Sequence, residues 1–436
     1  MNYPYRAIQF DHGLRTILVP MEGTKSVTVL AMVGTGSRFE DSKTNGISHF
    51  LEHMVFKGTK NFPTARELAS AIDEVGAEFN AFTSKEYTGY YVKCASSFVD
   101  LASDVVSDML LTARLLPADI EREKGVIVEE IHMYEDTPMR HIGDCFEKLI
   151  FDGSPLGWNI IGTESSVRSF TQDDFVHHLN TWYGFHNVVL VVAGDASVLN
   201  QKGFEHKLEH FFSKDEHTRT TKPTSAYIEQ LKDNPFNKRK RLSVHFKESA
   251  QAHFILGFPG LKRTDERRYA LTILSTLLGG NMSSRLFTEV REKRGLCYYV
   301  RSDEDHYHDC GVFGASAGVD PSRVDEAVKV VYEQLLLLAS DGEHSITHDE
   351  VKKAKSHVLG ATTLDLEDSM SIAHLFAGSA LLQNKVETIE EKLKRLENVT
   401  FEQVREVAKQ LIDPPNLYFS ILGPYQEEAR FERLLD

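Results

Sequence analysis

The segment NGISHFLEHMVFKGT, residues 45–59, carries the pattern from which we interpret the rest of the chain. Its apolar residues recur at the spacing of an amphipathic helix, and Gly58 follows where a C-terminal cap is expected. At about 100° per residue, His49, Glu52 and His53 fall together on the opposite face. Two imidazoles four residues apart can bind one metal ion, with a carboxylate beside them. The segment therefore predicts a helix with a metal-binding face, although an ordinary solvated face has the same pattern.

A later acidic segment can supply the missing ligand. A catalytic zinc ion takes three protein ligands, so two histidines need a partner from elsewhere. In DIEREKGVIVEEIHMYED, residues 119–136, Glu123 and Glu130 are seven residues apart and share a helix face with Val126 and Ile127. Acids on buried faces are rarely left without a partner. We expect this helix to contribute to the metal site; the alternative is an exposed acidic helix with incidental spacing.

A second group of potential ligands lies in EDHYHDC, residues 304–310. His306, His308 and Cys310 alternate there and would share one face of a strand. No acid or imidazole partner is identifiable nearby, so an ordinary strand edge is favoured over a metal site.

Length and composition limit the class of protein. A chain of 436 residues favours two domains of roughly 200 residues each, and 41% hydrophobic with 26% charged residues is typical of a globular protein. A net charge of −15 disfavours nucleic acid as a partner, because phosphates require a surplus of Lys and Arg. Four scattered cysteines match neither a disulfide framework nor a structural zinc signature.

The chain is expected to be cytoplasmic. Its N-terminus, MNYPYRAIQFDHGL, has no basic region followed by an apolar run and so does not resemble a secretory signal. No apolar stretch approaches the roughly 18 residues of a membrane span.

Strand and helix patterns alternate along the first half. Strands are expected at Ser26–Val33, Glu86–Cys94 and Asn187–Gly194, and helices at Ala65–Val75, Phe98–Leu111, Ala118–Met133 and Asp173–Thr181. The pattern restarts with strands at Leu242–Phe246 and His253–Phe258 and helices at Arg267–Leu278 and Ser284–Lys293. These patterns predict an α+β fold of two similar domains, each a mixed β-sheet with helices packed mainly on one face.

A polar stretch separates the two halves. Residues 214–240 contain two prolines, many charges and few large apolar side chains, which is typical of a linker. We therefore divide the chain into a zinc-binding domain (1–215), a linker (216–240) and a homologous C-terminal domain (241–436). NVVLVVAGD (187–195) and NLYFSILGP (416–424) close the two halves in a similar way, which favours a duplication.

Taken together, the motifs resemble the inverted-zincin metallopeptidases, the family of pitrilysin, insulysin and the mitochondrial processing peptidase. HFLEHMVFKGT followed by the Glu-x6-Glu helix carries the resemblance. The block EFNAFTSKEYTGYY (78–91) and the Arg-x6-Tyr pattern in REKRGLCYYV (291–300) occur in the family's order. The chain is most similar to the short, processing-peptidase-like bacterial members.

The resemblance implies a role for each matching residue of the metal centre. One Zn²⁺ per chain would be bound by His49, His53 and Glu130, and the register favours Glu130 over its neighbour in sequence. Glu52 would be the general base, and Glu123 a carboxylate that supports the site.

The resemblance also implies residues that contact the substrate. Asn80 and Ala81 match a strand edge along which a peptide backbone pairs. Arg291 and Tyr298 match a pair in the second half that helps to bind the substrate or the oxyanion.

These roles imply a zinc metalloendopeptidase. It would hydrolyse peptides or presequence-like unfolded segments with a zinc-activated water and Glu52 as base. A homodimer is expected, or a heterodimer with a degenerate homologue. The alternatives are a non-catalytic, core-protein-like structural subunit of the same fold and a chaperone-like peptide binder. Nothing in the sequence indicates the natural substrate, the cleavage preference, the metal bound in the cell or an opening motion.

Overall fold

The computed structural model describes residues 3–213, 235–236 and 240–435. The chain divides into two compact units. The first comprises Met1–Ile131, Trp158–Asp233 and Thr363–Glu391, and the second comprises His132–Gly157, Asn234–Thr362 and Lys392–Asp436. Each unit is therefore built mainly from one half of the sequence, with one segment contributed by the other half.

The first unit contains a six-stranded mixed sheet in the order β1-β2-β6-β3-β5-β4. Its strands are β1 (Arg6–Gln9), β2 (Arg15–Met21), β3 (Ser26–Val33), β4 (Glu78–Thr83), β5 (Thr88–Ala95) and β6 (Val188–Asp195). β6 pairs in parallel with β2, and the other pairings are antiparallel. Every residue of β6 is buried, as expected for a central strand covered on both faces.

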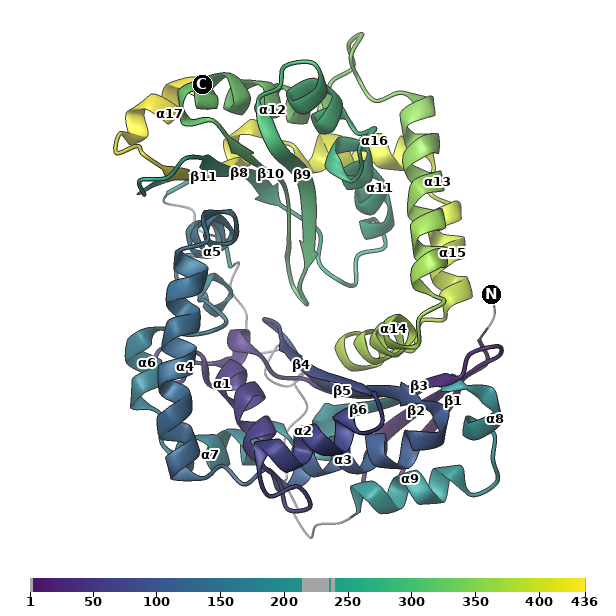
Figure 1. The fold of residues 1–436 in the computed structure, drawn as a ribbon. Coiled ribbons are helices and arrows are strands. Elements are labelled where there is room, and N and C mark those ends of the chain that lie inside the picture. The colour runs from purple at the N-terminus through teal and green to yellow at the C-terminus, as the bar shows by residue number, and fades with distance from the viewer. Residues whose placement is uncertain (1–2, 214–234, 237–239, 436) are drawn as a thin grey trace. The chain divides into compact units, whose positions relative to one another are not determined.

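Helices cover both faces of this sheet. The described helices of the first half that lie wholly or mainly in this unit are α1 (Ile47–Met54), α2 (Ala65–Asp73), α3 (Val99–Thr112), α4 (Pro117–Glu135), α6 (Glu164–Ser169), α7 (Gln172–Trp182), α8 (Ala196–Leu199) and α9 (Phe204–Phe212). α3 lies along one face, and α14 (Ser369–Leu382), which comes from the second half, lies along the other (Figure 1). α14 is anchored at its start, where the hydroxyls of Thr28 and Ser369 are 2.8 Å apart.

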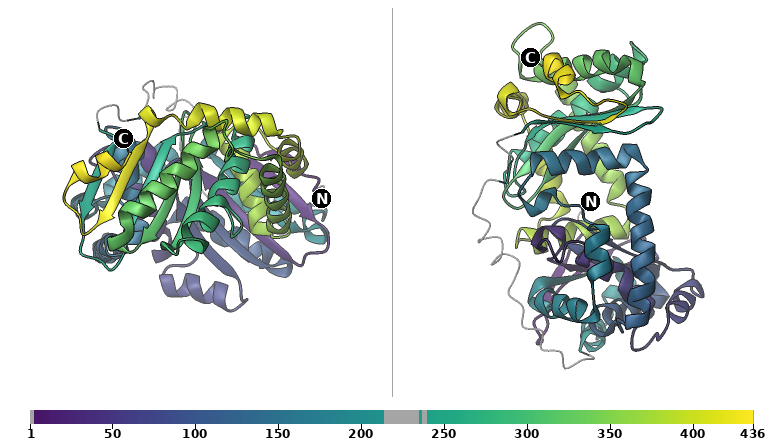
Figure 2. Two further views of the ribbon diagram at one scale, coloured as in Figure 1. Left: turned by 90° about the horizontal axis from the view of Figure 1, so that it is seen from above. Right: turned by 90° about the vertical axis from the view of Figure 1, so that its left-hand side faces the viewer.

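The second unit contains a five-stranded mixed sheet in the order β7-β11-β8-β10-β9. Its strands are β7 (Leu242–Phe246), β8 (Ala252–Pro259), β9 (Cys297–His306), β10 (Gly311–Val319) and β11 (Tyr418–Gly423). α11 (Arg268–Gly279) and α12 (Val324–Ala339) cover one face, and α16 (Phe401–Leu411) packs against these two helices (Figures 1 and 2). α5 (Pro138–Ile150), from the first half, packs on the other face against β11, β8 and β7. The remaining helices are α13 (His348–Asp365), α15 (Ile389–Glu397) and α17 (Glu428–Leu435).

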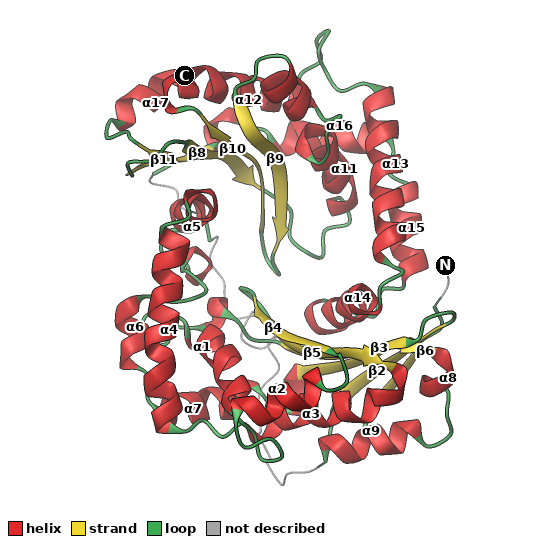
Figure 3. Ribbon diagram, in the orientation of Figure 1, coloured by secondary structure: helices red, strands yellow, loops and turns green. Residues whose placement is uncertain are grey.

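The two sheets have the same topology. β7, β11, β8, β10 and β9 follow one another as β2, β6, β3, β5 and β4 do, and in both series the first pairing is parallel and the rest antiparallel. Each sheet also receives one helix from the opposite half of the chain. The prediction of an α+β fold with two mixed sheets is confirmed, with helices mainly on one face in each unit (Figure 3).

Most predicted elements lie within a few residues of the observed ones, and β3 and β7 coincide with their predicted ranges. The predicted helix at Ser284–Lys293 is largely a π-helix over Phe287–Glu292. Most of the predicted linker 216–240 lies outside the described residues, and the domain limits at 215 and 241 stay predictions. In the part of the chain that the structure describes, no helix is long and apolar enough to cross a bilayer.

Candidate metal centre

The motif helix α1 is fixed by its apolar face and by an unusual N-terminal cap. Phe50 on this face is fully buried, with its ring centroid 4.9 Å from that of Phe175. Gly46 precedes the helix with a φ of 98° and has no side chain to act as a cap. The buried Glu40 replaces it, because its carboxylate accepts the backbone N–H groups of Gly46 and Ser48 at 2.8 and 2.9 Å. The polar face of α1 is thereby held in one orientation.

The end of the motif is a tight turn. After α1 the chain continues as a 3-10 turn over Val55–Lys57 and ends at Gly58, whose φ is 142°. A Cβ atom on Gly58 would lie 2.5 Å from the carbonyl oxygen of Pro63. Glycine is therefore required there by both conformation and space, which agrees with the predicted cap.

The acidic helix α4 differs in one respect from its prediction. Glu123, Ile127 and Glu130 lie along one face, with Ile127 fully buried and the Glu123 side chain 6% exposed. Val126 was expected on this buried face, but it is 52% exposed. It lies about 60° around the helix axis from Glu123, at the margin of the face, so the buried face is narrower than the sequence suggested.

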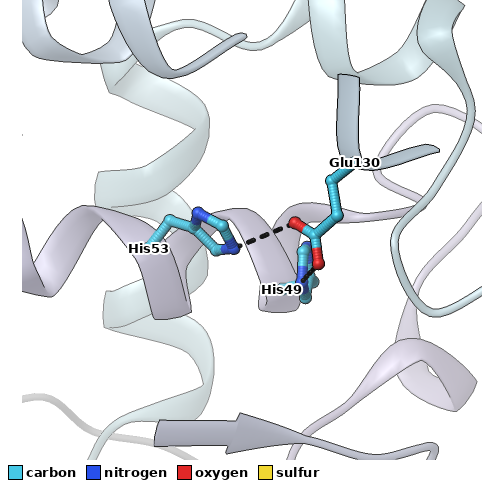
Figure 4. A group of neighbouring side chains, drawn as sticks. All are labelled: His49, His53 and Glu130. Atoms are coloured by element: carbon cyan, nitrogen blue, oxygen red, sulfur yellow. Dashed lines mark ion pairs between the residues drawn. The ribbon is translucent and has the colours of Figure 1, made fainter. Parts of the chain in front are cut away.

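Three of the predicted residues meet in the first unit. The ligand atoms of His49, His53 and Glu130 all lie within 4.8 Å of one another. The Glu130 carboxylate faces both rings, with Oε1 3.7 Å from His49 Nε2 and Oε2 3.4 Å from His53 Nε2 (Figure 4). The two imidazole centroids are 4.7 Å apart. Among the described residues, this is the one group of three that could hold a metal ion.

Glu123 binds the other side of the His53 ring. Its Oε1 is 3.0 Å from His53 Nδ1, and its Oε2 is 2.6 Å from the Lys57 ammonium. A carboxylate acceptor requires the hydrogen on Nδ1, so Nε2, which faces Glu130, is the nitrogen available to a metal ion. Metal-binding histidines commonly have this arrangement.

The two histidines differ in their affinity for protons. Burial, and then the proximity of His53, lowers the pKa of His49 to about 4. Burial also acts to lower the pKa of His53, but hydrogen bonds to Glu123 and Glu130 outweigh it and raise this pKa to about 9. The same contacts, acting against burial, lower the pKa values of Glu123 and Glu130. Without a cation, the acids of the site are therefore ionised and hold a proton on His53.

Glu52 lies beside this group on the same helix. Its Oε2 accepts a 2.6 Å hydrogen bond from the Thr83 hydroxyl. Burial raises the pKa of Glu52, while the bond from Thr83 acts in the opposite direction. The carboxylate therefore has a fixed orientation, and protonation is easier than for an exposed Glu.

Asn80 and Ala81 lie on β4, which forms an edge of the sheet. Asn80 is exposed and Ala81 is buried. The side-chain Oδ1 of Asn80 accepts the backbone N–H of Ala81 at 2.9 Å. One donor of this strand is thus occupied by a side chain of the strand itself.

Arg291 and Tyr298 belong to the second unit and are neighbours there. The Arg291 guanidinium lies 5.5 Å from the Tyr298 ring centroid, and Tyr298 is 77% exposed. Their role in binding the substrate or the oxyanion stays a prediction.

The structure does not bring the three potential ligands of EDHYHDC together into one metal-binding group. His306 ends β9 and donates from Nδ1 to the carbonyl of Leu261 at 2.6 Å, while Cys310 directly precedes β10. Within the described ranges, His306, His308 and Cys310 do not form a metal-binding group. The strand-edge interpretation was therefore the better one.

Sequence reasoning missed two polar partners, Lys57 and Thr83. Lys57 is four residues after His53, one helical turn along the same face. Thr83 is two residues after Ala81 and therefore on the same side of β4. Both could have been found by extending the face of each motif by one repeat.

The residues present are suited to zinc. Two histidines with one carboxylate are a donor set found in catalytic zinc sites. His53 has its second nitrogen held by Glu123, and His49 Nδ1 is buried without a hydrogen-bond partner among the described residues. The arrangement can hold a divalent cation and has a carboxylate, Glu52, that is outside the donor set.

Known proteins resemble this chain in both sequence and fold. The family described as Insulinase (Peptidase family M16) matches residues 15–164, and the Peptidase M16 inactive domain matches residues 169–358. An uncharacterised zinc protease of Streptomyces coelicolor is 36% identical over 95% of this chain and 89% of its own length. One of Bacillus subtilis is 37% identical over 92% of this chain and 94% of its own.

Solved structures share the whole fold. A protease from Helicobacter pylori has a TM-score of 0.84 at 24% identity, covering 97% of this chain and 100% of its own. A chain of complex III2 from Candida albicans has a TM-score of 0.81 at 17% identity, with 99% of both chains covered. The matches along both halves, and relatives that are more than 30% identical over nearly the full length, show that this chain belongs to peptidase family M16.

Proposed function

We propose that the chain is a zinc metalloendopeptidase that hydrolyses peptides or presequence-like unfolded segments, with one Zn²⁺ bound by His49, His53 and Glu130. The observation that carries the proposal is the position of Glu52 on the same helix as the two histidines, outside the donor set. Relatives named zinc proteases support the same class.

Different residues of the chain have different roles in peptide hydrolysis. When bound, zinc supplies Lewis-acid activation of the attacking water and the scissile carbonyl. Glu52 takes a proton from the water and passes it to the leaving amine. Thr83 holds one oxygen of Glu52 in place. The β4 edge at Asn80 and Ala81 binds the peptide backbone, and Arg291 and Tyr298 bind the substrate or donate to the oxyanion.

The test combines metal analysis with cleavage of a quenched fluorescent peptide library. The wild type is expected to bind one zinc per chain and to lose activity in chelator. Glu52→Gln should retain the zinc and lose about 10²- to 10⁴-fold in kcat/KM. Glu74→Gln, an exposed acid at the end of α2, is the matched control and should behave as the wild type.

Each outcome separates one part of the proposal from the rest. An active Glu52→Gln enzyme would remove the base assignment but leave the metal centre. Activity in metal-free protein would contradict the metallopeptidase itself. A protein that binds zinc but cleaves no peptide favours the alternative, a non-catalytic structural subunit or peptide binder. The fold shared with a complex III2 chain is compatible with that alternative but does not select it, because 17% identity shows the fold alone.

A homodimer belongs to the same proposal, with a degenerate homologue as the alternative partner. All the proposed catalytic residues lie in this one chain, so a second active subunit of another type is not required. Light scattering after size exclusion should give twice the chain mass of 49.3 kDa. A fully active monomer would contradict it.

A further inference from the structure

Lys57 lies on the metal-centre side of the turn that follows α1. It is the last residue of the 3-10 turn, and Gly58 then turns the chain away. The carbonyl of Gly58 accepts the backbone N–H of Arg114 at 3.0 Å, which ties this turn to the segment before α4. The backbone at Lys57 is thereby fixed relative to the helix that carries Glu123.

The partner of Lys57 is a buried carboxylate with both oxygens in use. Lys57 Nζ is 2.6 Å from Glu123 Oε2, and Glu123 Oε1 is 3.0 Å from His53 Nδ1. The Glu123 side chain is only 6% exposed and the Lys57 side chain 32%. Exposed ion pairs contribute little, but removing one partner from a buried pair leaves an uncompensated charge. Lys57 is therefore more than a surface charge that happens to lie near an acid.

Two carboxylates of α4 lie close to His53, and they differ in one respect. Glu130 faces Nε2 of His53, whereas Glu123 faces Nδ1 and also Lys57. A catalytic zinc site has three protein ligands and one open position. A Glu123 released from Lys57 would be a buried anion next to a cation, and it could turn toward the metal.

We propose that Lys57 is a positioning residue of the metal centre. It holds Glu123 as the hydrogen-bond acceptor of His53 and keeps that carboxylate out of the donor set. The inference rests on the proposed zinc centre and adds a residue that selects which of the two acids becomes the ligand.

The test measures zinc affinity by competition with a chromophoric chelator on the full chain. Lys57→Met should weaken Zn²⁺ binding by about tenfold, because His53 loses its Nδ1 acceptor when Glu123 turns away. Tenfold is about the lower end of the effect of losing an outer hydrogen-bond partner. Lys57→Arg keeps the cation and should stay within about threefold of the wild type. Lys124→Met is the matched control, because Lys124 pairs at 2.6 Å with Glu121, an exposed acid one turn away on α4. It should leave the affinity unchanged.

Two further measurements separate positioning from a general loss of structure. In a Glu123→Gln background, Lys57→Met should have no additional effect, because the coupling passes through Glu123. With Co²⁺ as the probe, the visible absorption of Lys57→Met should weaken as a further oxygen joins the metal, and that of Glu123→Gln/Lys57→Met should not. Thermal unfolding of the metal-free variants checks that each is folded.

The outcomes are distinct. A wild type that does not bind zinc would remove the proposed function, whatever Lys57 does. A wild type that binds zinc, with Lys57→Met of equal or higher affinity, would overturn the role of Lys57 alone. Additive effects of Lys57→Met and Glu123→Gln, or an unchanged Co²⁺ spectrum, would also overturn it.

Discussion

The two halves of the chain build the same sheet but use the first α-helix after corresponding strands differently. α1 follows β3 in the first unit, and α11 follows β8 in the second. α1 buries one face and carries His49, Glu52 and His53 on the other. α11 is RYALTILSTLLG, without His, Cys or acidic residues, and most of its residues are buried. One scaffold position therefore carries the candidate metal-binding residues in one copy and only packing residues in the other.

The difference teaches what the metal face requires in addition to the fold. The buried face of α1 is as apolar as that of α11, so packing is preserved in both copies. What α1 adds is an external cap from Glu40 and a glycine turn at each end. These features fix the axial position of a short helix, and a metal site needs that position to be constant.

The largest expected effect comes from replacing the two histidines of α1 by apolar residues, such as those that α11 carries. His49→Leu/His53→Leu removes both imidazoles and should reduce bound zinc to less than about a tenth per chain. Activity should fall by more than about 10³-fold, because the metal is lost as well as its ligands. Metal analysis and the peptide library measure both.

The fold should survive this change, since α11 shows that an apolar helix is accepted at this position. Circular dichroism and thermal unfolding of the metal-free protein are the control. A collapsed fold would mean that the two positions are not equivalent. Retained activity would place the chemistry elsewhere.

The next effect compares the two buried faces directly. Phe50→Ala on α1 and Leu274→Ala on α11 each truncate a fully buried side chain. We expect losses of about 3–5 and about 2–5 kcal/mol in the unfolding free energy of the respective unit. Only Phe50→Ala should also weaken zinc binding, because of these two helices only α1 carries proposed zinc ligands. Urea unfolding with and without Zn²⁺ measures both, and a zinc-dependent loss in Leu274→Ala would contradict the division of roles.

The sequence predicted the shared parts of the two halves better than the parts that differ. The apolar runs of β3 and β6 predicted strands nearly to the residue, because central strands have a simple pattern. The alternating pattern of the edge strand β7 predicted its range as well. The strand order and the exchange of α5 and α14 were not predicted. They depend on contacts between segments more than a hundred residues apart, which periodicity does not report.

The candidate site shows the same limit. Helical spacing brought His49, Glu52 and His53 to one face, but the pairing with Glu130 rested on a family resemblance. Val126 was predicted on the buried face of α4 but is exposed, because the spacing of two acids does not fix the width of that face. Lys57 and Thr83 lie one repeat beyond the motif residues, and their partners, Glu123 and Glu52, come from other elements, so neither pairing was predicted.

A smaller effect, on the pH dependence of stability, concerns the helices that pack behind α1 and α11. α7 packs behind α1 with the buried His178, whose Nε2 is 3.5 Å from the Ser48 hydroxyl. The corresponding layer behind α11 is α16, with apolar Val404 and Val407 buried. Burial, and then His177, lowers the pKa of His178 from 6.5 to about 3. This layer therefore contains a buried titratable histidine in the first unit, whereas Val404 and Val407 at the corresponding place in the second unit do not titrate.

The sign of the pH effect follows from proton binding. Between pH 6.5 and about 3, the unfolded chain binds more protons at His178 than the folded chain does. The free energy of unfolding is therefore not reduced by His178 above this range, and it decreases as the pH falls through it. Between pH 7 and 5 the loss should be about 2 kcal/mol. His178→Leu should flatten the profile, and the exposed His177→Leu should not. Unfolding at both pH values measures this, and identical slopes for the wild type and His178→Leu would exclude His178 as the cause.

The smallest effect concerns the corresponding edge strands β4 and β9. β9 carries Arg301, Asp303 and Asp305, and charges on an edge disfavour pairing with another strand. β4 carries Asn80, which occupies the N–H of Ala81. If a peptide pairs with β4, its carbonyl competes with this side chain for the same hydrogen.

Asn80→Ala releases that N–H and should therefore lower KM by about threefold with kcat unchanged, the size of one exposed hydrogen bond. Glu78→Gln, an exposed position on the same side of β4, is the control and should change KM less. Initial rates with a single cleaved peptide separate kcat from KM. A KM that rises in Asn80→Ala would mean that the Asn80 amide itself contacts the substrate, and an unchanged KM would place backbone pairing on another strand.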